Sequence, residues 1–260
     1  MMQTMKWYQE KYGDLPGFDE VFNEAKTFLG QQRPVLTDFL QPSQLALLQK
    51  LCPGQATAFG GYAESEKKRA FLSPDYFSPQ PADFQLALFE IDYPRRFNKL
   101  THSQILGSLA NSGVETSTFG DIVTDGAGRW QFFGKKELAA FFTGQIKRVG
   151  RAAVKINELP LRELVPVFDD SKDFDIVGAS LRLDGLVSKL AGLPRAEAKA
   201  MISQGLVQVD FLPVKQPDAT VAASSTLSIR HHGRWQLQSV QTTRKGRVRV
   251  AGQAWLSHHN

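Results

Sequence analysis

Between residues 84 and 156, short segments with the periodicity of a strand alternate with short segments with the periodicity of a helix. Apolar residues at every second position, or in short runs, indicate strands, whereas spacings of three and four residues indicate amphipathic helices. The expected elements are, in order, a strand over Phe84–Ile91, a helix over Ser103–Ala110, a hairpin of Asp121–Thr124 with Arg129–Phe133, a helix over Lys135–Val149 and a strand over Ala152–Ile156. The order βαββαβ predicts a ferredoxin-like domain, an arrangement that RNA-recognition folds share but that fixes no function by itself.

A separate small α/β domain is expected before this block. After the Pro16-Gly17 turn, the apolar residues with helical spacing are Phe18, Val21, Phe22, Ala25, Phe28 and Leu29. A second helix over Ser43–Leu51 and two strands over Ala56–Tyr62 and Arg69–Leu72 complete this domain. The two prolines of residues 78–81 break any regular element, which indicates a linker.

The C-terminal segment begins with two short amphipathic helices, which open at Ser180 and end near Ser203. The expected strands are Leu206–Val209, Leu227–Arg230 and Arg234–Leu237, followed by a basic tail at Arg244–Arg249, while residues 164–176 are expected to be a connector. We therefore predict an α+β chain of three domains. They are a small N-terminal α/β domain over residues 1–77, the ferredoxin-like βαββαβ domain over 82–164 and an αα-plus-β-hairpin domain over 178–250.

Basic charge is concentrated at the C-terminal end of the chain. Residues 180–260 hold eleven Lys and Arg against four Asp and Glu, whereas the first 179 residues hold twenty against twenty-two. The whole chain has a net charge of +5 and an ordinary globular composition, with 42% hydrophobic residues. A polyanion such as RNA or DNA is the natural partner of a clustered basic surface, and a solvated face that aids solubility is the alternative.

The sequence lacks the patterns of several other classes of protein. Cys52 is the only cysteine, so no intramolecular disulfide can form, which fits a reducing compartment. No run of eighteen apolar residues predicts a membrane span, and the first fourteen residues do not read as a secretory signal. The histidines have no zinc-ligand spacing, and neither a dinucleotide-binding glycine motif nor a G-x-S-x-G motif is present. We therefore expect a cytoplasmic protein with no cofactor, metal or catalytic residue.

The two C-terminal helices carry the best candidates for RNA contacts. Arg195 and Lys199 are four residues apart and point the same way, and Arg182 is expected near them if the helices pack as a hairpin. Guanidinium groups bind phosphate in a bidentate manner, so shape rather than sequence would carry specificity. Ion pairs with Asp184 or Glu197 are the alternative. Further candidates are Lys189, Arg230, Arg234, Arg244 and Lys245.

Three other groups of residues have competing interpretations. Lys67, Lys68 and Arg69 beside two glycines could hold a phosphate or lie in a solvated turn, and Arg95 with Arg96 could form a second RNA surface or be ordinary loop charges. Phe132 and Phe133 alternate faces on a strand, where one could stack on a base, but packing in the core is the better expectation.

The C-terminal segment resembles the S-four RNA-binding domain, the module named for the fourth small-subunit ribosomal protein. The residues that carry this resemblance are Arg182-Leu183-Asp184, Leu186, Arg195, Ala198-Lys199, Ile202, Gly205, Val207, Val209, Leu227-Ser228-Ile229-Arg230 and Gly233-Arg234-Trp235. The resemblance implies binding of structured RNA through the helical face that holds the arginines. Asp210 stands where the family usually has Asn, and Ser225-Thr226 replaces its usual Gly-Asp turn.

Nearly the whole chain resembles the YlmH family of bacterial ribosome-associated proteins. The matching motifs are Leu36-Thr37-Asp38-Phe39-Leu40, Phe59-Gly60-Gly61-Tyr62, Glu66-Lys67-Lys68-Arg69-Ala70, Pro74, Arg95-Arg96-Phe97, Leu100-Thr101-His102, Ile105-Leu106-Gly107-Ser108-Leu109 and Gly120-Asp121-Ile122. The family often has Arg where this chain has Phe119. The resemblance implies association with the large ribosomal subunit in ribosome-associated quality control. Its implied partners are large-subunit rRNA and peptidyl-tRNA, and we expect a monomer off the ribosome.

Two other classes of function remain as alternatives. Arg182-Leu183-Asp184-Gly185 resembles the catalytic motif of pseudouridine synthases, in which the Asp is the nucleophile, so the chain could be an RNA-modifying enzyme. Only 76 residues follow Asp184, however, and a carboxylate in the first turn of a helix favours the N-terminal dipole. A membrane- or division-linked adaptor is the other class, but no amphipathic helix with a basic polar face supports it.

Overall fold

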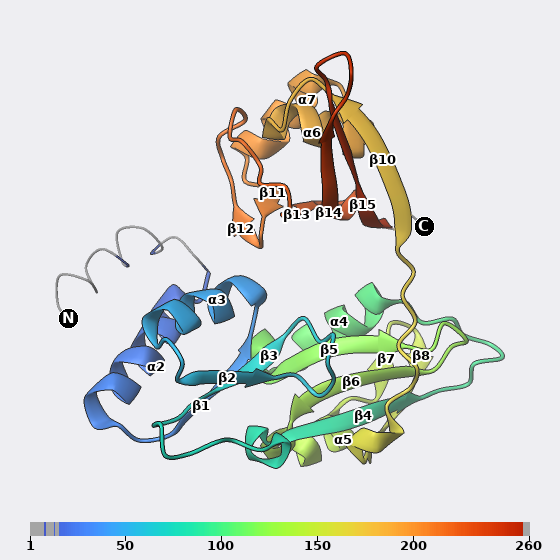
Figure 1. Cartoon of the computed structure of the whole chain (residues 1–260). Helices are drawn as coiled ribbons and strands as arrows, with labels where there is room; N and C mark the ends of the chain where they lie inside the picture. The colour runs from blue at the N-terminus through green and yellow to red at the C-terminus, as the bar shows by residue number, and fades with distance from the viewer. Residues whose placement is uncertain (1–7, 9–12, 14–15, 257–260) are drawn as a thin grey trace. The chain divides into compact units, whose positions relative to one another are not determined.

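A computed structural model of the chain describes Tyr8, Gly13 and residues 16–256 (Figure 1). The chain divides into two compact units, Met1–Phe168 and Asp169–Asn260, and each is described by itself. Within the described residues, no helix is both long enough and apolar enough to cross a membrane. The architecture is mixed α and β in both units, as the sequence predicts.

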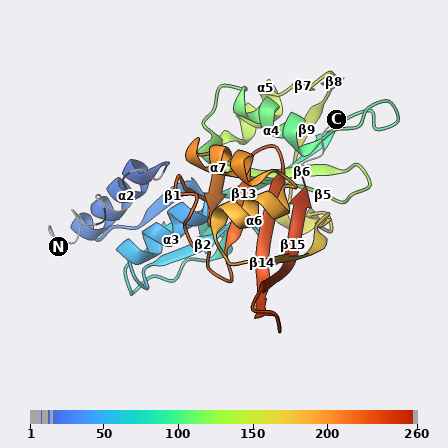
Figure 2. The ribbon, with the colours of Figure 1, turned by 90° about the horizontal axis from the view of Figure 1, so that it is seen from above.

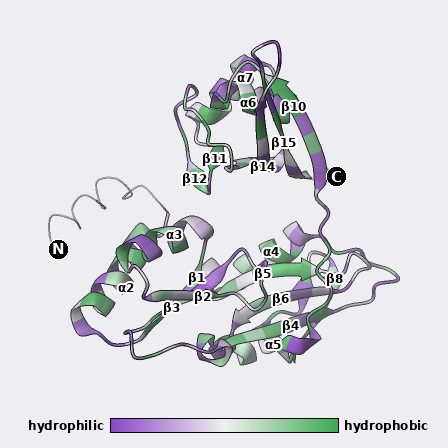
Figure 3. Ribbon diagram, viewed as in Figure 1, coloured by the Kyte–Doolittle hydropathy of each residue, from purple (hydrophilic) through white to green (hydrophobic). Residues whose placement is uncertain are grey.

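The centre of the first unit is a four-stranded antiparallel sheet with the strand order β5-β6-β4-β9. Its elements are β4 (Leu86–Asp92), α4 (His102–Ala110), β5 (Phe119–Thr124), β6 (Trp130–Lys135), α5 (Ala139–Gln145) and β9 (Lys155–Leu159). The two helices pack against one face of this sheet, where Phe89, Phe132 and Phe142 form the centre of a buried cluster. Figure 3 shows the hydrophobic colouring of β4 and β5. The predicted ferredoxin-like βαββαβ order is confirmed.

The helix predicted over Lys135–Val149 is shorter in the structure. Lys135 ends β6, a 3₁₀ turn covers Lys136–Leu138, and α5 stops at Gln145. The chain then forms a small hairpin of β7 (Arg148–Val149) with β8 (Ala152–Ala153). Gly150 has a φ of +56° at the turn of this hairpin, a conformation that glycine adopts at little cost.

The N-terminal part of the first unit, over residues 16–77, holds the helices α2 and α3 and a second sheet with the order β1-β3-β2. Its elements are α2 (Phe18–Gln31), β1 (Val35–Leu40), α3 (Pro42–Leu51), β2 (Ala56–Phe59) and β3 (Lys68–Leu72). Both predicted helices are present. Strand β1 was not predicted, although it pairs along most of its length with β3.

The N-terminal part covers the face of the four-stranded sheet that the helices α4 and α5 leave open. Leu88 and Phe133 lie on this face, and they share a buried cluster with Phe39 of β1. The Tyr62 ring stacks on Phe133 at a centroid distance of 5.6 Å. A Cβ atom on Gly61 would lie 2.1 Å from the Phe133 ring, so only glycine allows this approach. The N-terminal and ferredoxin-like segments therefore form one compact unit, and the division into three domains stays a prediction.

The second unit is a six-stranded antiparallel sheet with two helices. Its elements are β10 (Lys172–Gly178), α6 (Leu183–Leu190), α7 (Arg195–Ser203), β11 (Val207–Val209), β12 (Leu212–Pro213), β13 (Thr226–Ile229), β14 (Gly233–Thr242) and β15 (Val248–Leu256). The strand order is β10-β15-β14-β13-β11-β12. Leu183, Leu186 and Val187 of α6 pack in one buried cluster with Ala198 and Ile202 of α7.

Two expectations for this unit were wrong. The connector expected over residues 164–176 contains five of the seven residues of β10, and the expected basic tail forms the turn between β14 and β15 and the start of β15. Arg244 and Lys245 lie in the turn between β14 and β15, and β15 pairs with both β14 and β10. Long-range pairing stabilises both strands, and no local pattern in the sequence reports it.

The two departures from the S-four pattern contact each other. The Asp210 carboxylate accepts hydrogen bonds from the Thr226 backbone N–H at 2.8 Å and from the Ser225 hydroxyl at 2.9 Å. Asp210 has a φ of +51°, a left-handed conformation that Asp tolerates better than most residues. The departures therefore replace one set of turn contacts by another, and they are not part of the helices α6 and α7.

Candidate nucleic-acid interface

The helices α6 and α7 bring three cationic side chains to one buried carboxylate. Asp184 is fully buried in the first turn of α6. Arg195 donates from Nη2 to both carboxylate oxygens at 2.9 and 3.0 Å, and Arg182 donates from Nε and Nη2 at 3.3 and 3.2 Å. The Lys199 Nζ lies 4.0 Å from the same carboxylate. We call Arg182, Asp184, Arg195 and Lys199 the Asp184 cluster.

Local structure places each member of the Asp184 cluster. Arg182 is the N-cap residue of α6, and the Asp184 backbone N–H donates to the Pro217 carbonyl at 2.9 Å. Gly192 turns the chain with a φ of +68°, and Arg195 begins α7 directly after the cap residue Pro194. Lys199 lies one helical turn further on the same face. The predicted helical hairpin is therefore what brings the three cations together.

Electrostatics keep the Asp184 carboxyl ionised. Burial by itself would raise the pKa of Asp184, but the hydrogen bonds from Arg195 and Arg182 outweigh burial and lower the pKa to about 2. The three cationic side chains stay between 43% and 58% exposed. Because one carboxylate faces three cations, the Asp184 cluster presents an excess of two positive charges. Its guanidinium groups are held in fixed orientations with donors left for a second anion.

The ion pairs with Asp184 that the sequence suggested as an alternative to RNA contacts are present. They do not exclude those contacts, because the cations remain at the surface. Asp184 itself is enclosed by the two arginines and has no exposed surface. A nucleophile must reach its substrate, so this arrangement favours a structural role for the carboxylate.

The other predicted RNA contacts lie on several different elements of the second unit. Lys189 is exposed in the last turn of α6, and Arg230 is exposed after β13. The Arg234 guanidinium lies 5.2 Å from the centre of the Phe211 ring, near the start of β14. Arg244 and Lys245 follow the far end of this ten-residue strand, roughly 25 Å away at about 3.3 Å per residue. Their role in binding RNA stays a prediction.

Two of the three basic residues beside Gly60 and Gly61, Lys67 and Arg69, stabilise the fold. Arg69 is buried and donates to the carbonyls of Thr37 at 2.8 Å and Phe84 at 3.0 Å. Lys67 donates from Nζ to the carbonyls of Thr116 at 3.1 Å and Phe119 at 3.3 Å. These contacts join the N-terminal part to the sheet. The two side chains therefore have a structural role, which is neither the phosphate binding nor the solvated turn that the sequence suggested.

Asp121 completes this junction and was not singled out as a functional residue from the sequence. Its carboxylate accepts hydrogen bonds from the Tyr62 hydroxyl at 2.9 Å, the Glu66 backbone N–H at 2.7 Å and the Lys67 backbone N–H at 3.0 Å. The Gly-Asp motif at residues 120–121 was the only signal for it. Asp121 therefore fixes the β2–β3 loop on strand β5.

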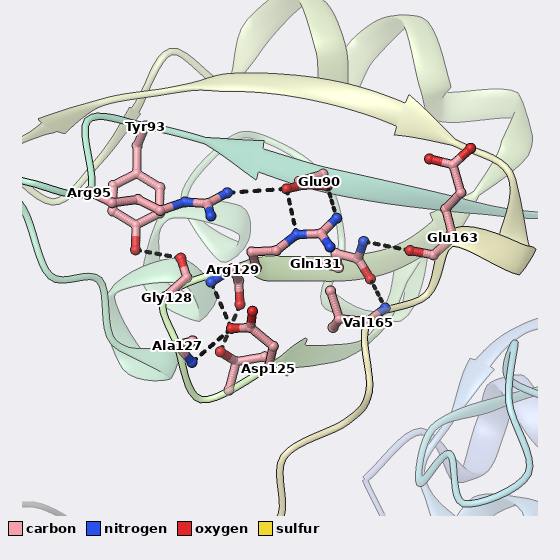
Figure 4. Close-up of polar contacts among 11 residues, drawn as sticks. Glu90, Tyr93, Arg95, Asp125, Ala127, Gly128, Arg129, Gln131, Glu163 and Val165 are labelled. Carbon is pink, nitrogen blue, oxygen red and sulfur yellow. Dashed lines mark hydrogen bonds and ion pairs between the residues drawn. The ribbon is translucent and has the colours of Figure 1, made fainter.

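The β4–α4 loop and the β5–β6 turn are joined by a polar network (Figure 4). Glu90 pairs with Arg129 at 2.7 Å and with Arg95 at 3.2 Å. The Tyr93 hydroxyl donates to the Gly128 carbonyl at 2.8 Å, and the Asp125 carboxylate accepts from the Arg129 backbone N–H at 2.9 Å. The hydrogen bond from Arg129 is the main cause that lowers the pKa of Glu90. Arg95 is therefore an anchor of its loop.

Phe132 and Phe133 are fully buried, which confirms the expectation of core packing.

Comparisons with known proteins agree with these features. Residues 79–163 match a family described as "Putative RNA-binding domain in YlmH", and residues 181–227 match the S4 domain. The chain is 34% identical over 250 residues to "Ribosome-associated protein quality control protein P2" of Bacillus subtilis (strain 168), which covers 94% of this chain and 96% of that protein. It is also 34% identical to the structure of "Cell division protein ylmH from Streptococcus pneumoniae", with a TM-score of 0.50 over 59% of this chain and 94% of that one. The chain belongs to the YlmH family.

Proposed function

We propose that this chain is a ribosome-associated RNA-binding protein without enzymatic activity, and that the Asp184 cluster binds RNA phosphates. The observation that carries this proposal is the convergence of Arg182, Arg195 and Lys199 on one buried carboxylate. A fixed pair of guanidinium groups matches the geometry of phosphate oxygens. Since phosphates carry no sequence information, the cluster would recognise the shape of a structured RNA.

The ribosomal part of the proposal rests on the relative from Bacillus subtilis, whose name describes ribosome-associated quality control. We infer the same role for this chain, with the large ribosomal subunit, its rRNA and tRNA as partners and with a cytoplasmic location. We also infer that the protein is a monomer off the ribosome. One matched family is described as a putative RNA-binding domain, and the enclosed Asp184 supports a binding role over that of an RNA-modifying enzyme.

The test is sedimentation of the tagged protein with ribosomal particles from a cell lysate through a sucrose gradient. The informative variant carries Arg182→Gln, Asp184→Asn and Arg195→Gln together, which we call the neutral triple variant. It removes the charges of both arginines and of Asp184, keeps Lys199 and leaves no unpaired buried carboxylate, so the fold should persist. A double variant with Arg33→Ala and Arg162→Ala is the control, because it removes two exposed arginines of the first unit.

Wild type and the control should travel with the large subunit, while the neutral triple variant stays at the top of the gradient. If the neutral triple variant travels with the large subunit as wild type does, the Asp184 cluster is not the RNA-binding site. If wild type itself stays at the top, the ribosomal role is wrong. Unfolding temperatures of all three proteins establish that each is folded.

A further inference from the structure

The loop between β4 and α4 presents an aromatic ring to solvent. The Phe97 side chain is 87% exposed, the highest value among the large hydrophobic side chains that are exposed in the described residues. Tyr76, at 83%, is the next. An apolar ring held in water is unfavourable, so such a ring marks a candidate contact site.

The Phe97 ring is held by an ordered turn. The Phe97 and Asn98 backbone N–H groups donate to the Pro94 carbonyl at 3.1 and 3.2 Å, and the Asn98 side-chain amide donates to the same carbonyl at 3.2 Å. Arg95 ties the start of the loop to Glu90, and Leu100 buries its end in the core. The loop that carries the ring is therefore ordered before a partner binds, which reduces the entropy lost on binding.

Exposed cations surround this loop on two segments of the chain. Arg96 and Lys99 flank Phe97 in the loop itself, and the β7–β8 hairpin carries Lys147, Arg148 and Arg151, all five of them exposed. Residues 93–101 and 146–155 contain no Asp or Glu. Every charged residue in these two segments is therefore Lys or Arg.

The loop and the hairpin meet at the start of α4. A Cβ atom on Gly150, at the tip of the hairpin, would lie 3.6 Å from the side chain of Gln104 in the first turn of α4. The Gln104 side chain in turn accepts a hydrogen bond from the Thr101 backbone N–H at 3.1 Å, two residues after Lys99. Figures 1 and 2 show the β4–α4 loop and the β7–β8 hairpin at the same edge of the first unit.

We propose that Phe97 stacks on an unpaired RNA base while the cations of the β4–α4 loop and the β7–β8 hairpin hold the neighbouring phosphates. Stacking on an aromatic ring inside a basic surface is the common chemistry of single-stranded RNA binding. A protein-binding hot spot would combine the ring with further apolar groups, whereas the charged residues that flank Phe97 in the loop are Arg96 and Lys99. The face of the sheet on which a ferredoxin-like domain could stack bases is already filled by Phe39 and Tyr62. This inference rests on the proposed RNA-binding function and adds an unpaired nucleotide as a second ligand.

The test measures binding of two fluorescent single-stranded RNA probes to the full chain. One probe is an oligouridylate, and the other has the same backbone with abasic sites in place of the bases. Both are titrated with wild type and the neutral triple variant, each with and without Phe97→Ala, so that the Asp184 cluster does not mask the loop. Phe97→Trp keeps a ring, and Tyr76→Ala removes the other highly exposed aromatic ring as a matched control.

Phe97→Ala should weaken binding of the oligouridylate about five-fold or more, the lower end of the effect of one stacked base, and should leave the abasic probe unaffected. Phe97→Trp and Tyr76→Ala should bind as their parent proteins do. Equal binding of the oligouridylate with and without Phe97 would overturn the stacking site, as would an equal loss on both probes. Failure of the neutral triple variant to bind either probe would also overturn the stacking site.

These outcomes separate the two proposals. If the neutral triple variant loses large-subunit binding while Phe97 has no effect on either probe, the proposed function stands and only the stacking site fails. If wild type binds no RNA, the proposed function itself fails. If Phe97→Ala keeps its RNA affinity but no longer sediments with ribosomal particles, the ring contacts a protein and the base-stacking proposal is wrong.

Discussion

Replacement of Asp184 by asparagine tests whether the buried carboxylate organises the Asp184 cluster. The substitution keeps the shape of the side chain but removes its charge, so Arg182 and Arg195 lose their charge-assisted hydrogen bonds. The lowering of the Asp184 pKa from 3.8 to about 2 corresponds to about 2 kcal/mol of stabilisation. Because both guanidinium groups are about half exposed, water screens the pair, and we expect Asp184→Asn to cost about 1–2 kcal/mol.

The effect of Asp184→Asn should depend on pH. The pKa of Asp184 in the folded protein lies below its ordinary value of 3.8. Its ionised form therefore stabilises the fold fully above about pH 4, and this stabilisation is lost as the pH falls toward 2. The difference in stability between wild type and variant should shrink by roughly half between pH 6 and pH 3.

Hydrogen exchange measured by mass spectrometry on peptides from α6 and α7 reports the stability of this unit within the full chain. At pH 6, protection factors in these peptides should fall about 5- to 30-fold in Asp184→Asn, the equivalent of 1–2 kcal/mol. Asp175→Asn is the matched control, because it breaks the exposed ion pair with Arg249 and should change them little. Unchanged protection in Asp184→Asn, or a change of equal size at pH 6 and pH 3, would refute the reasoning.

Three further expectations follow from the geometry and charge of the protein. Gly61→Ala should lower the unfolding free energy of the first unit by about 2–4 kcal/mol, because its Cβ would lie 2.1 Å from the Phe133 ring at a φ of +107°. Gly54→Ala, which meets no atom within 4 Å, is the control, and equal losses in urea unfolding would contradict the steric argument. Burial, followed by the nearby Asp38 carboxylate, raises the pKa of Glu24 from 4.5 to about 7, so wild type should lose stability as the pH rises from 4.5 to 7. Glu24→Gln should unfold at the same temperature as wild type at pH 4.5 and at a higher temperature than wild type at pH 8. Equal unfolding temperatures of the two proteins at both pH values would disprove this. If about four phosphates are contacted, log affinity for RNA should fall with log salt at a slope of roughly −3, and a flat response would argue for a protein partner.

The sequence alone predicted the elements whose pattern is local. The βαββαβ order, the helices α2 and α3 and the hairpin of α6 with α7 all follow from apolar spacing within one element, which needs no knowledge of the partner. Strand β10 escaped prediction because it is stabilised by pairing with the distant β15, which itself pairs with both β10 and β14. Asp173 and Asp175 make β10 look like a polar connector, and only pairing with distant residues makes it a strand.

The residue types of the candidate site were also present in the sequence, since the spacing of Arg195 and Lys199 places them on one helix face. The tertiary structure decided which charged or aromatic groups are exposed. It buried Asp184 among three cations, used Arg69 to join two parts of the chain and left Phe97 in water. Burial depends on neighbours that are far away in the sequence, whereas periodicity reports only the face on which a residue lies. The sequence therefore determined which chemistry the chain carries, and packing determined where that chemistry is accessible to a partner.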